Sequence, residues 1–154
     1  MGTERATFAA GCFWDVEVAF RAIPGVVEVV VGYTGGHRDD PRYEDVRAET
    51  TGHAEAVDVT FDPAVISFEQ LVGHFFALHD PTQINRQGLD VGTRYRSAIF
   101  AHTDEQVAVA EAVKARLAPA HRLPITTQVR LARAFWPAEA EHQRYLEKRG
   151  LVVA

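Results

Sequence analysis

Strand and helix signals alternate along this 154-residue chain, and the alternation limits the fold more than any other feature of the sequence. Apolar residues recur every three or four positions in some segments and every second position in others, which are the periods of helices and strands. The expected order is β-α-β-β-α-β-α-β-α. It predicts an α+β fold, a two-layer α/β sandwich with a mixed sheet and a ferredoxin-like core.

The expected elements leave two long segments, 34–52 and 79–94, without periodicity. Long loops in compact domains usually carry function, so we expect a site there. Because no repeat or linker divides the chain, we expect residues 1–154 to form a single catalytic domain. The strands are expected at 6–10, 26–33, 54–61, 96–101 and 126–131, and the helices at 13–22, 67–78, 103–117 and 137–148.

The charge balance bears on the partners of the protein. With 16 basic and 21 acidic side chains the net charge is -5, which disfavours nucleic acid or an anionic membrane, although a local basic patch stays compatible with it. No apolar run approaches the roughly 20 residues that span a bilayer. The seven histidines lack metal-ligand spacing, and no phosphate-binding glycine motif is present. We therefore expect a cytoplasmic monomer with no cofactor, metal, nucleic acid or membrane partner.

The single cysteine, Cys12, lies between a strand and a helix. Gly11 before it permits a sharp turn, and the free N–H groups at a helix start favour an anion. The pattern predicts a thiol pKa below the free value of about 8.5. The alternative is a small buried apolar residue, as most lone cysteines are. Phe13 and Trp14 are equally compatible with core packing and with an apolar wall beside a reactive sulfur.

Several motifs follow one another from about Thr7 to Gly150. They are GCFW at 11–14, GYTGG at 32–36, PRY at 41–43, GHAEAV at 52–57, HDPTQ at 79–83, RQGLDVGTRYRSAIF at 86–100, PITT at 124–127 and FWPAEAEHQRYL at 135–146. Together these motifs closely resemble the A-type peptide methionine sulfoxide reductases. The resemblance implies reduction of the S epimer of methionine sulfoxide, free or in peptides, with repair of oxidised proteins.

By this resemblance Cys12 is the nucleophile, and Phe13 and Trp14 form the pocket for the substrate methyl group. Glu55 matches the acid that protonates the sulfoxide oxygen, a role that requires a pKa raised by burial. Its small neighbours Ala54 and Ala56 are expected to leave room for a ligand. A solvated glutamate on a strand is the ordinary alternative.

The resemblance also implies two oxygen-binding hydroxyls, those of Tyr43 and Tyr95, which otherwise read as packing or rim residues. Asp90 matches an aspartate that supports this network through hydrogen bonds, with a simple turn residue as the alternative. Glu139 and His142 match positions close to the site.

The chain departs from the family in its cysteines. Many relatives regenerate themselves with further cysteines, and Arg47 stands where some relatives carry one. The sulfenic acid formed on Cys12 must then be reduced by an external thiol, namely thioredoxin, glutaredoxin or a small thiol. Two alternatives remain open, a one-cysteine thiol peroxidase and a non-catalytic module that binds oxidised methionine.

Overall fold

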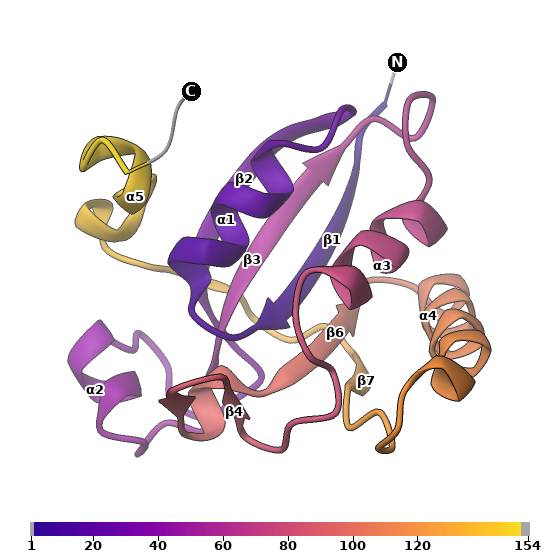
Figure 1. Ribbon diagram of the computed structural model, residues 1–154. Coiled ribbons are helices and arrows are strands. Elements are labelled where there is room, and N and C mark those ends of the chain that lie inside the picture. Colours follow the sequence, from indigo (N-terminus) through magenta and orange to yellow (C-terminus); the bar gives the residue numbers. More distant parts are fainter. Residues whose placement is uncertain (1, 152–154) are drawn as a thin grey trace.

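The computed structural model describes residues 2–151 and has helices packed on one face of a six-stranded mixed sheet (Figure 1). A small two-stranded hairpin stands apart from the sheet. The strands are β1 (Glu4–Ala10), β2 (Val26–Thr34), β3 (Ala54–Phe61), β4 (Arg86–Gln87), β5 (Asp90–Val91), β6 (Ser97–Ala101), β7 (Gln128–Leu131) and β8 (Trp136–Pro137), and the helices are α1 (Phe13–Arg21), α2 (Tyr43–Arg47), α3 (Phe68–Ala77), α4 (Asp104–Leu117) and α5 (Tyr145–Lys148).

The sheet has the strand order β7-β6-β1-β3-β2-β8. Its four central strands pair antiparallel, and β1-α1-β2-β3-α3-β6 is the connection of a ferredoxin-like core. Helix α4 then crosses over to β7, which pairs parallel with β6, as a parallel neighbour requires. The α+β fold with a mixed sheet and ferredoxin-like core is therefore confirmed.

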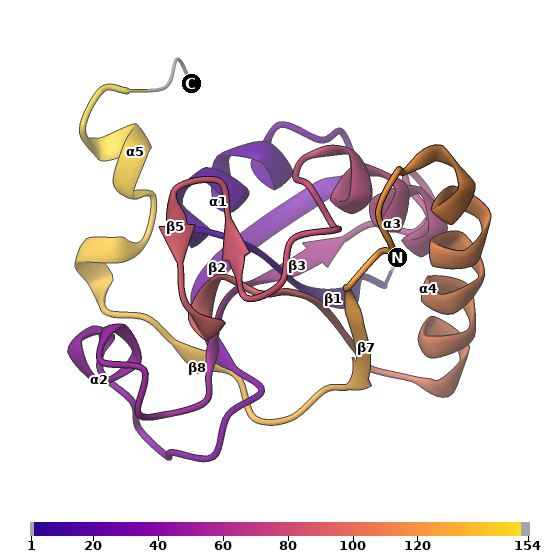
Figure 2. The ribbon, with the colours of Figure 1, turned by 60° about the horizontal axis from the view of Figure 1, so that its bottom comes forward.

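The two faces of the sheet are covered differently. Phe8 on β1 stacks on Phe20 of α1 at 4.8 Å between ring centroids and on Phe75 of α3 at 5.3 Å, so the helices close the larger core. The opposite face carries mostly alanine side chains around Phe100. The chain between β7 and β8, which includes Phe135, runs along this face (Figure 2).

The expected continuous helix at 137–148 is wrong. Trp136–Pro137 instead pairs with β2 as an edge strand, and a short 3₁₀ turn follows at Ala140–His142. Arg144 has φ +54, a left-handed conformation that no helix continues through, so only Tyr145–Lys148 is helical. The Arg144 N–H donates to the buried Glu17 carboxylate at 2.9 Å, and this contact between distant segments outweighs the local helical pattern.

Both segments expected to be irregular contain short elements that periodicity does not reveal. Helix α2 has five residues and each strand of the β4–β5 hairpin has two, so neither is long enough for its period to recur recognisably in the sequence. Among the residues that the structure describes, no helix has both the length and the apolar character to cross a membrane.

Two glycines give opposite predictions for replacement by alanine. A Cβ at Gly36 would lie 2.4 Å from the backbone of Thr51 and of His53, whereas one at Gly73, in α3, meets nothing within 4 Å. We expect Gly36→Ala to lower the free energy of unfolding by about 1–3 kcal/mol through overpacking. Gly73→Ala should raise it by up to about 1 kcal/mol, because glycine is a poor helix former. Urea unfolding measures both, and equal effects would contradict the packing argument.

Candidate active site

Cys12 lies at the start of α1, as the sequence predicts. Its carbonyl oxygen accepts the N–H groups of Asp15 and Val16 at 3.2 and 3.3 Å, and its side chain is half-buried. Gly11 has φ +99, and a Cβ there would lie 2.9 Å from the Gln87 side chain, so the turn requires glycine. The thiol lines a cavity of about 250 Å³ between α1, the end of α3 and the β4–β5 hairpin.

The expected fall in the pKa of the Cys12 thiol is wrong in direction. Burial, together with the negative charges of Glu55 and Asp15, raises this pKa from 9.0 to about 12. The N–H groups of Trp14 and Asp15 at the helix start act in the opposite sense, but they are outweighed. The resting thiol is therefore neutral at physiological pH.

Glu55 lies beside this helix start with only 2% of its surface exposed. Its Oε1 accepts the Phe13 N–H at 3.2 Å, and Arg94 Nε lies 3.8 Å from its Oε2. The side chain points to the helix-covered face of the sheet. Ala54 and Ala56 belong to the cluster on the opposite face, so the expectation that they make room for a ligand at Glu55 is wrong.

The pKa of Glu55 is raised from 4.5 to about 7, chiefly by burial. The Phe13 N–H and the Arg94 guanidinium lower it, whereas the carboxylates of Asp90 and Glu49 raise it. The raised pKa that an acid role requires is thus confirmed. Near neutral pH, Glu55 holds a proton in a substantial fraction of molecules, next to the only thiol in the chain.

Aromatic rings from three segments gather around His142. Phe13 lies 5.7 Å from this ring and Tyr43 lies 4.4 Å from it, measured between centroids. The Trp14 indole N–H donates to His142 Nδ1 at 3.2 Å, which places the imidazole proton of a neutral ring on Nε2. Trp14 also stacks on Tyr145, with 3.8 Å between the ring centroids. Phe13 is buried in the core, whereas Trp14 is only partly buried and packs against the core.

Glu139 connects this aromatic group to the sheet. Its Oε1 accepts the Tyr33 hydroxyl at 2.9 Å, and its Oε2 accepts the Tyr43 N–H at 3.0 Å. Ligand atoms of Glu139, Glu141 and His142 lie within 4.8 Å of one another, the spacing of a metal site. Since Glu139 and His142 already accept these hydrogen bonds, we interpret the group as structural: it holds the segment at 139–142 against Tyr33, Tyr43 and Trp14.

Tyr95 occupies a 3₁₀ turn at Thr93–Tyr95 and is 9% exposed. Its hydroxyl accepts from Arg94 Nη2 at 3.0 Å, and the guanidinium carbon lies 4.4 Å from the centroid of its ring. Arg94 also donates to Glu49 at 3.2 Å, so it connects Glu49, Glu55 and Tyr95. Arg94 lies in the same motif as Tyr95, at 86–100, but nothing in the local pattern of the sequence predicts its contacts with Glu49 and Glu55.

Most of the predicted site residues are brought together. Burial and the Glu55 charge raise the pKa of both Tyr43 and Tyr95, so both hydroxyls share the environment of that carboxyl. Asp90 is exposed and lines the cavity at Cys12. Within residues 2–151 its side chain forms no hydrogen bond to either tyrosine, and its supporting role stays a prediction. Two site residues were missed, Tyr33 and Arg94.

Comparison with known proteins agrees with this arrangement. A family model described as "Peptide methionine sulfoxide reductase" matches residues 4–152. The "Peptide methionine sulfoxide reductase MsrA" of Acidobacterium capsulatum is 58% identical over 149 residues, covering 96% of each chain. The crystal structure of Mxr1 from Saccharomyces cerevisiae in reduced form has a TM-score of 0.93 at 36% identity, covering 99% of this chain and 88% of the yeast chain. The structure of Mxr1 in complex with Trx2 has a TM-score of 0.67 at 29% identity, covering 93% of this chain and 84% of the yeast chain.

The pKa of Glu55 makes stability depend on pH. In the folded protein it is about 7, above the ordinary 4.5, so the folded state keeps a proton that the unfolded chain releases between these values. The stability from this group is complete below about pH 4.5 and is lost as the pH rises through about 7. Between about pH 5 and 8 we expect the unfolding free energy of the wild type to fall by on the order of 2–3 kcal/mol relative to Glu55→Gln.

Urea unfolding of both proteins at each pH measures this difference. Histidines titrate alike in the two proteins, so their contributions cancel in the subtraction. Parallel pH dependence of the two proteins would contradict the raised pKa.

Proposed function

Because this chain belongs to the peptide methionine sulfoxide reductase A family and reduces methionine sulfoxide in the repair of oxidised proteins, we propose that Cys12 is the sulfur nucleophile and Glu55 the acid. The observation that carries the proposal is the buried Glu55 carboxyl, bonded to the Phe13 N–H one residue after the thiol. A proton donor with a pKa of about 7 and an oxidisable thiol sulfur are thereby held side by side.

In the first half-reaction the Cys12 sulfur attacks the sulfoxide sulfur while Glu55 protonates the sulfoxide oxygen. The new bond between the two sulfurs forms as the protonated oxygen leaves as water. A water molecule then attacks the Cys12 sulfur and breaks that bond, so methionine is released, the sulfoxide is reduced by two electrons and the thiol is oxidised to a sulfenic acid. Protonation is needed because an unprotonated oxide is a poor leaving group. The Cys12 thiol proton balances the proton that Glu55 gives up.

The pKa values of Cys12 and Glu55 indicate the order in which the proton transfers and the attack occur. With its pKa near 12 the thiol stays protonated until a sulfoxide is bound, and with its pKa near 7 Glu55 arrives at the reaction carrying its proton. When Glu55 protonates the substrate oxygen, positive charge develops on the sulfoxide sulfur. That positive charge stabilises the thiolate form of Cys12 at the point of attack. Activation of Cys12 therefore follows substrate binding.

The surrounding residues give the substrate a defined orientation. We assign the apolar contact with the methyl group to the partly buried Trp14 and to Phe13, which lies in the core. The hydroxyls of Tyr43 and Tyr95 hold the oxygen near Glu55, and Asp90 lies at the rim. The methyl group, the sulfoxide oxygen and the peptide chain of the substrate thus each have their own binding position. A sulfoxide of the opposite configuration at sulfur would have two of these groups in each other's position. We propose the S epimer as the accepted form, as the resemblance to the family implies.

Regeneration requires a second thiol from outside this chain. The sulfenic acid on Cys12 condenses with a thiol to give a mixed disulfide and water, and a further thiol releases Cys12 and a new disulfide. Arg47, at the exposed end of α2, offers no sulfur for this step. Thioredoxin, glutaredoxin or a small thiol would serve, and the complex of yeast Mxr1 with Trx2 supports thioredoxin. We place this chemistry in a single catalytic domain, in a cytoplasmic monomer.

Substitution of Cys12 tests the nucleophile and the stereochemistry together. With excess dithiothreitol, the wild type should consume L-methionine-S-sulfoxide and leave the R epimer, while Cys12→Ser should consume neither. Chromatographic separation of the epimers measures both results. The variant Arg122→Gln is a suitable control, since Arg122 is exposed and remote from the site residues. Turnover by Cys12→Ser would place the nucleophile elsewhere.

The first half-reaction should stop after one turnover when no reductant is present. We expect one methionine released per protein molecule and a mass gain of one oxygen on Cys12, because the chain holds no second cysteine. Quantitative amino-acid analysis and intact-protein mass spectrometry measure these results. Continued release without reductant, or no oxygen on Cys12, would contradict the mechanism. Adding thioredoxin, glutaredoxin or glutathione in turn to the oxidised protein then identifies the reductant.

A further inference from the structure

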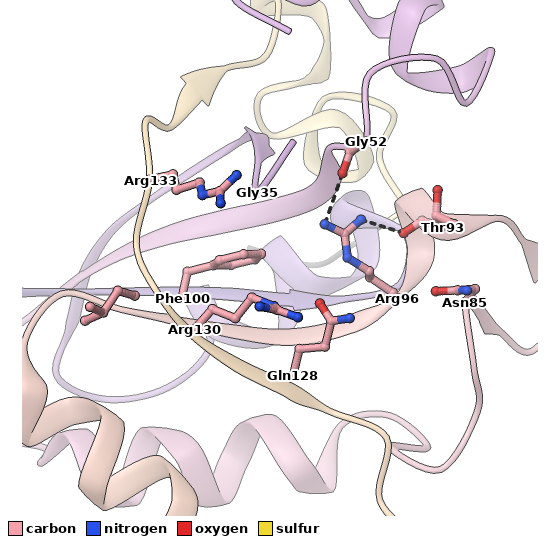
Figure 3. Close-up of a pocket in the computed structure, with 10 residues that line it drawn as sticks. Gly35, Gly52, Asn85, Thr93, Arg96, Phe100, Gln128, Arg130 and Arg133 are labelled. Carbon is pink, nitrogen blue, oxygen red and sulfur yellow. Dashed lines mark hydrogen bonds between the residues drawn. The ribbon is translucent and has the colours of Figure 1, made fainter. Parts of the chain in front are cut away.

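A second cavity, of about 420 Å³, lies on the sheet face opposite the helices (Figure 3). Three arginines line it, Arg96, Arg130 and Arg133, and Figure 3 shows their guanidinium groups around the ring of Phe100. No aspartate or glutamate is among its lining residues. The cavity shares no residue with the cavity at Cys12, so the proposed reduction chemistry makes no use of it.

The strand register produces this cluster. β6 and β7 pair parallel, with Phe100 opposite Arg130, and paired residues point to the same side of a sheet. Arg96 precedes Phe100 by four residues and therefore shares its side as well. Arg133 joins from the segment that runs along this face after β7. Arg96 directly before β6, Arg130 on β7 and Arg133 after β7 thus place three positive charges around one cavity.

The arginines are poorly compensated. Arg96 donates to two backbone carbonyls, those of Thr93 at 3.0 Å and Gly52 at 3.1 Å, which fix its position without neutralising its charge. Within residues 2–151, Arg130 and Arg133 form neither a side-chain hydrogen bond nor an ion pair. Burial and the nearby Arg130 charge lower the pKa of Arg96, and they outweigh the Glu49 carboxylate, which raises it.

We propose that this cavity binds a small multivalent anion, of the organic phosphate or polycarboxylate class. Guanidinium groups present forked N–H donors that match phosphate and carboxylate oxygens, and two of the three forks are free. The volume lies in the range of small-molecule sites, about 300–1,000 Å³, and exceeds what one inorganic phosphate fills.

Isothermal titration calorimetry with sodium pyrophosphate and with sodium citrate tests the proposal on the full chain. The two probes separate the phosphate and carboxylate forms of the ligand, and sodium chloride at equal ionic strength is the blank. The variant R130Q/R133Q removes the two free guanidiniums and leaves Arg96 with its backbone contacts. The matched control R116Q/R122Q removes the same charge from exposed arginines elsewhere on the surface.

We expect saturable one-to-one binding of at least one probe, unchanged in R116Q/R122Q. In R130Q/R133Q the dissociation constant should rise at least about tenfold, because charge-assisted hydrogen bonds are lost. Absence of saturable binding to either probe would overturn the proposal. Equal weakening in both double variants would also overturn it, since net charge alone would then explain the binding. Circular dichroism establishes that both variants are folded.

Discussion

The hydrogen bond from the Phe13 N–H to the Glu55 carboxyl, 3.2 Å long, is the contact on which the arrangement around the thiol depends. It joins the first turn of α1 to the middle of the sheet, and so fixes where Cys12 lies relative to a buried acid. The same carboxyl is 2% exposed and 3.8 Å from Arg94 Nε, a buried nitrogen with no hydrogen-bond partner in the described chain. Glu55 therefore supplies the buried charge beside Cys12 and also fixes the position of the backbone at the start of α1.

The hydrophobic face of the sheet explains why this acid is buried. Glu55 pairs with Tyr33 across β2 and β3, and the residues that follow it at every second position, Val57 and Val59, are fully buried core. The strand alternation that builds the core thus also carries a carboxyl into it. Burial of an acid without full compensation is costly, and the protein meets part of that cost by keeping the proton.

How much of the fold can be predicted from the sequence depends on the length of each periodic apolar segment. The long strands and helices follow from apolar periodicity, and the motifs around Cys12 and Glu55 predict the central site residues. The last segment could not be predicted, because Arg144 takes its left-handed conformation through a contact with Glu17, which is remote in the sequence. The thiol pKa was mispredicted because helix-start N–H groups are visible in a sequence, whereas burial beside Glu55 is a property of the fold.

The high pKa of the Cys12 thiol has a consequence for how the protein endures oxidising conditions. Peroxides and alkylating agents react with thiolates, and burial keeps the Cys12 sulfur in the less reactive thiol form at neutral pH. A sulfur that is held as a thiolate can be driven to irreversible sulfinic and sulfonic acids by the stress that generates methionine sulfoxide. In the proposed mechanism the sulfur becomes reactive only when a bound sulfoxide takes the proton of Glu55, so burial should slow the loss of Cys12 to diffusing oxidants.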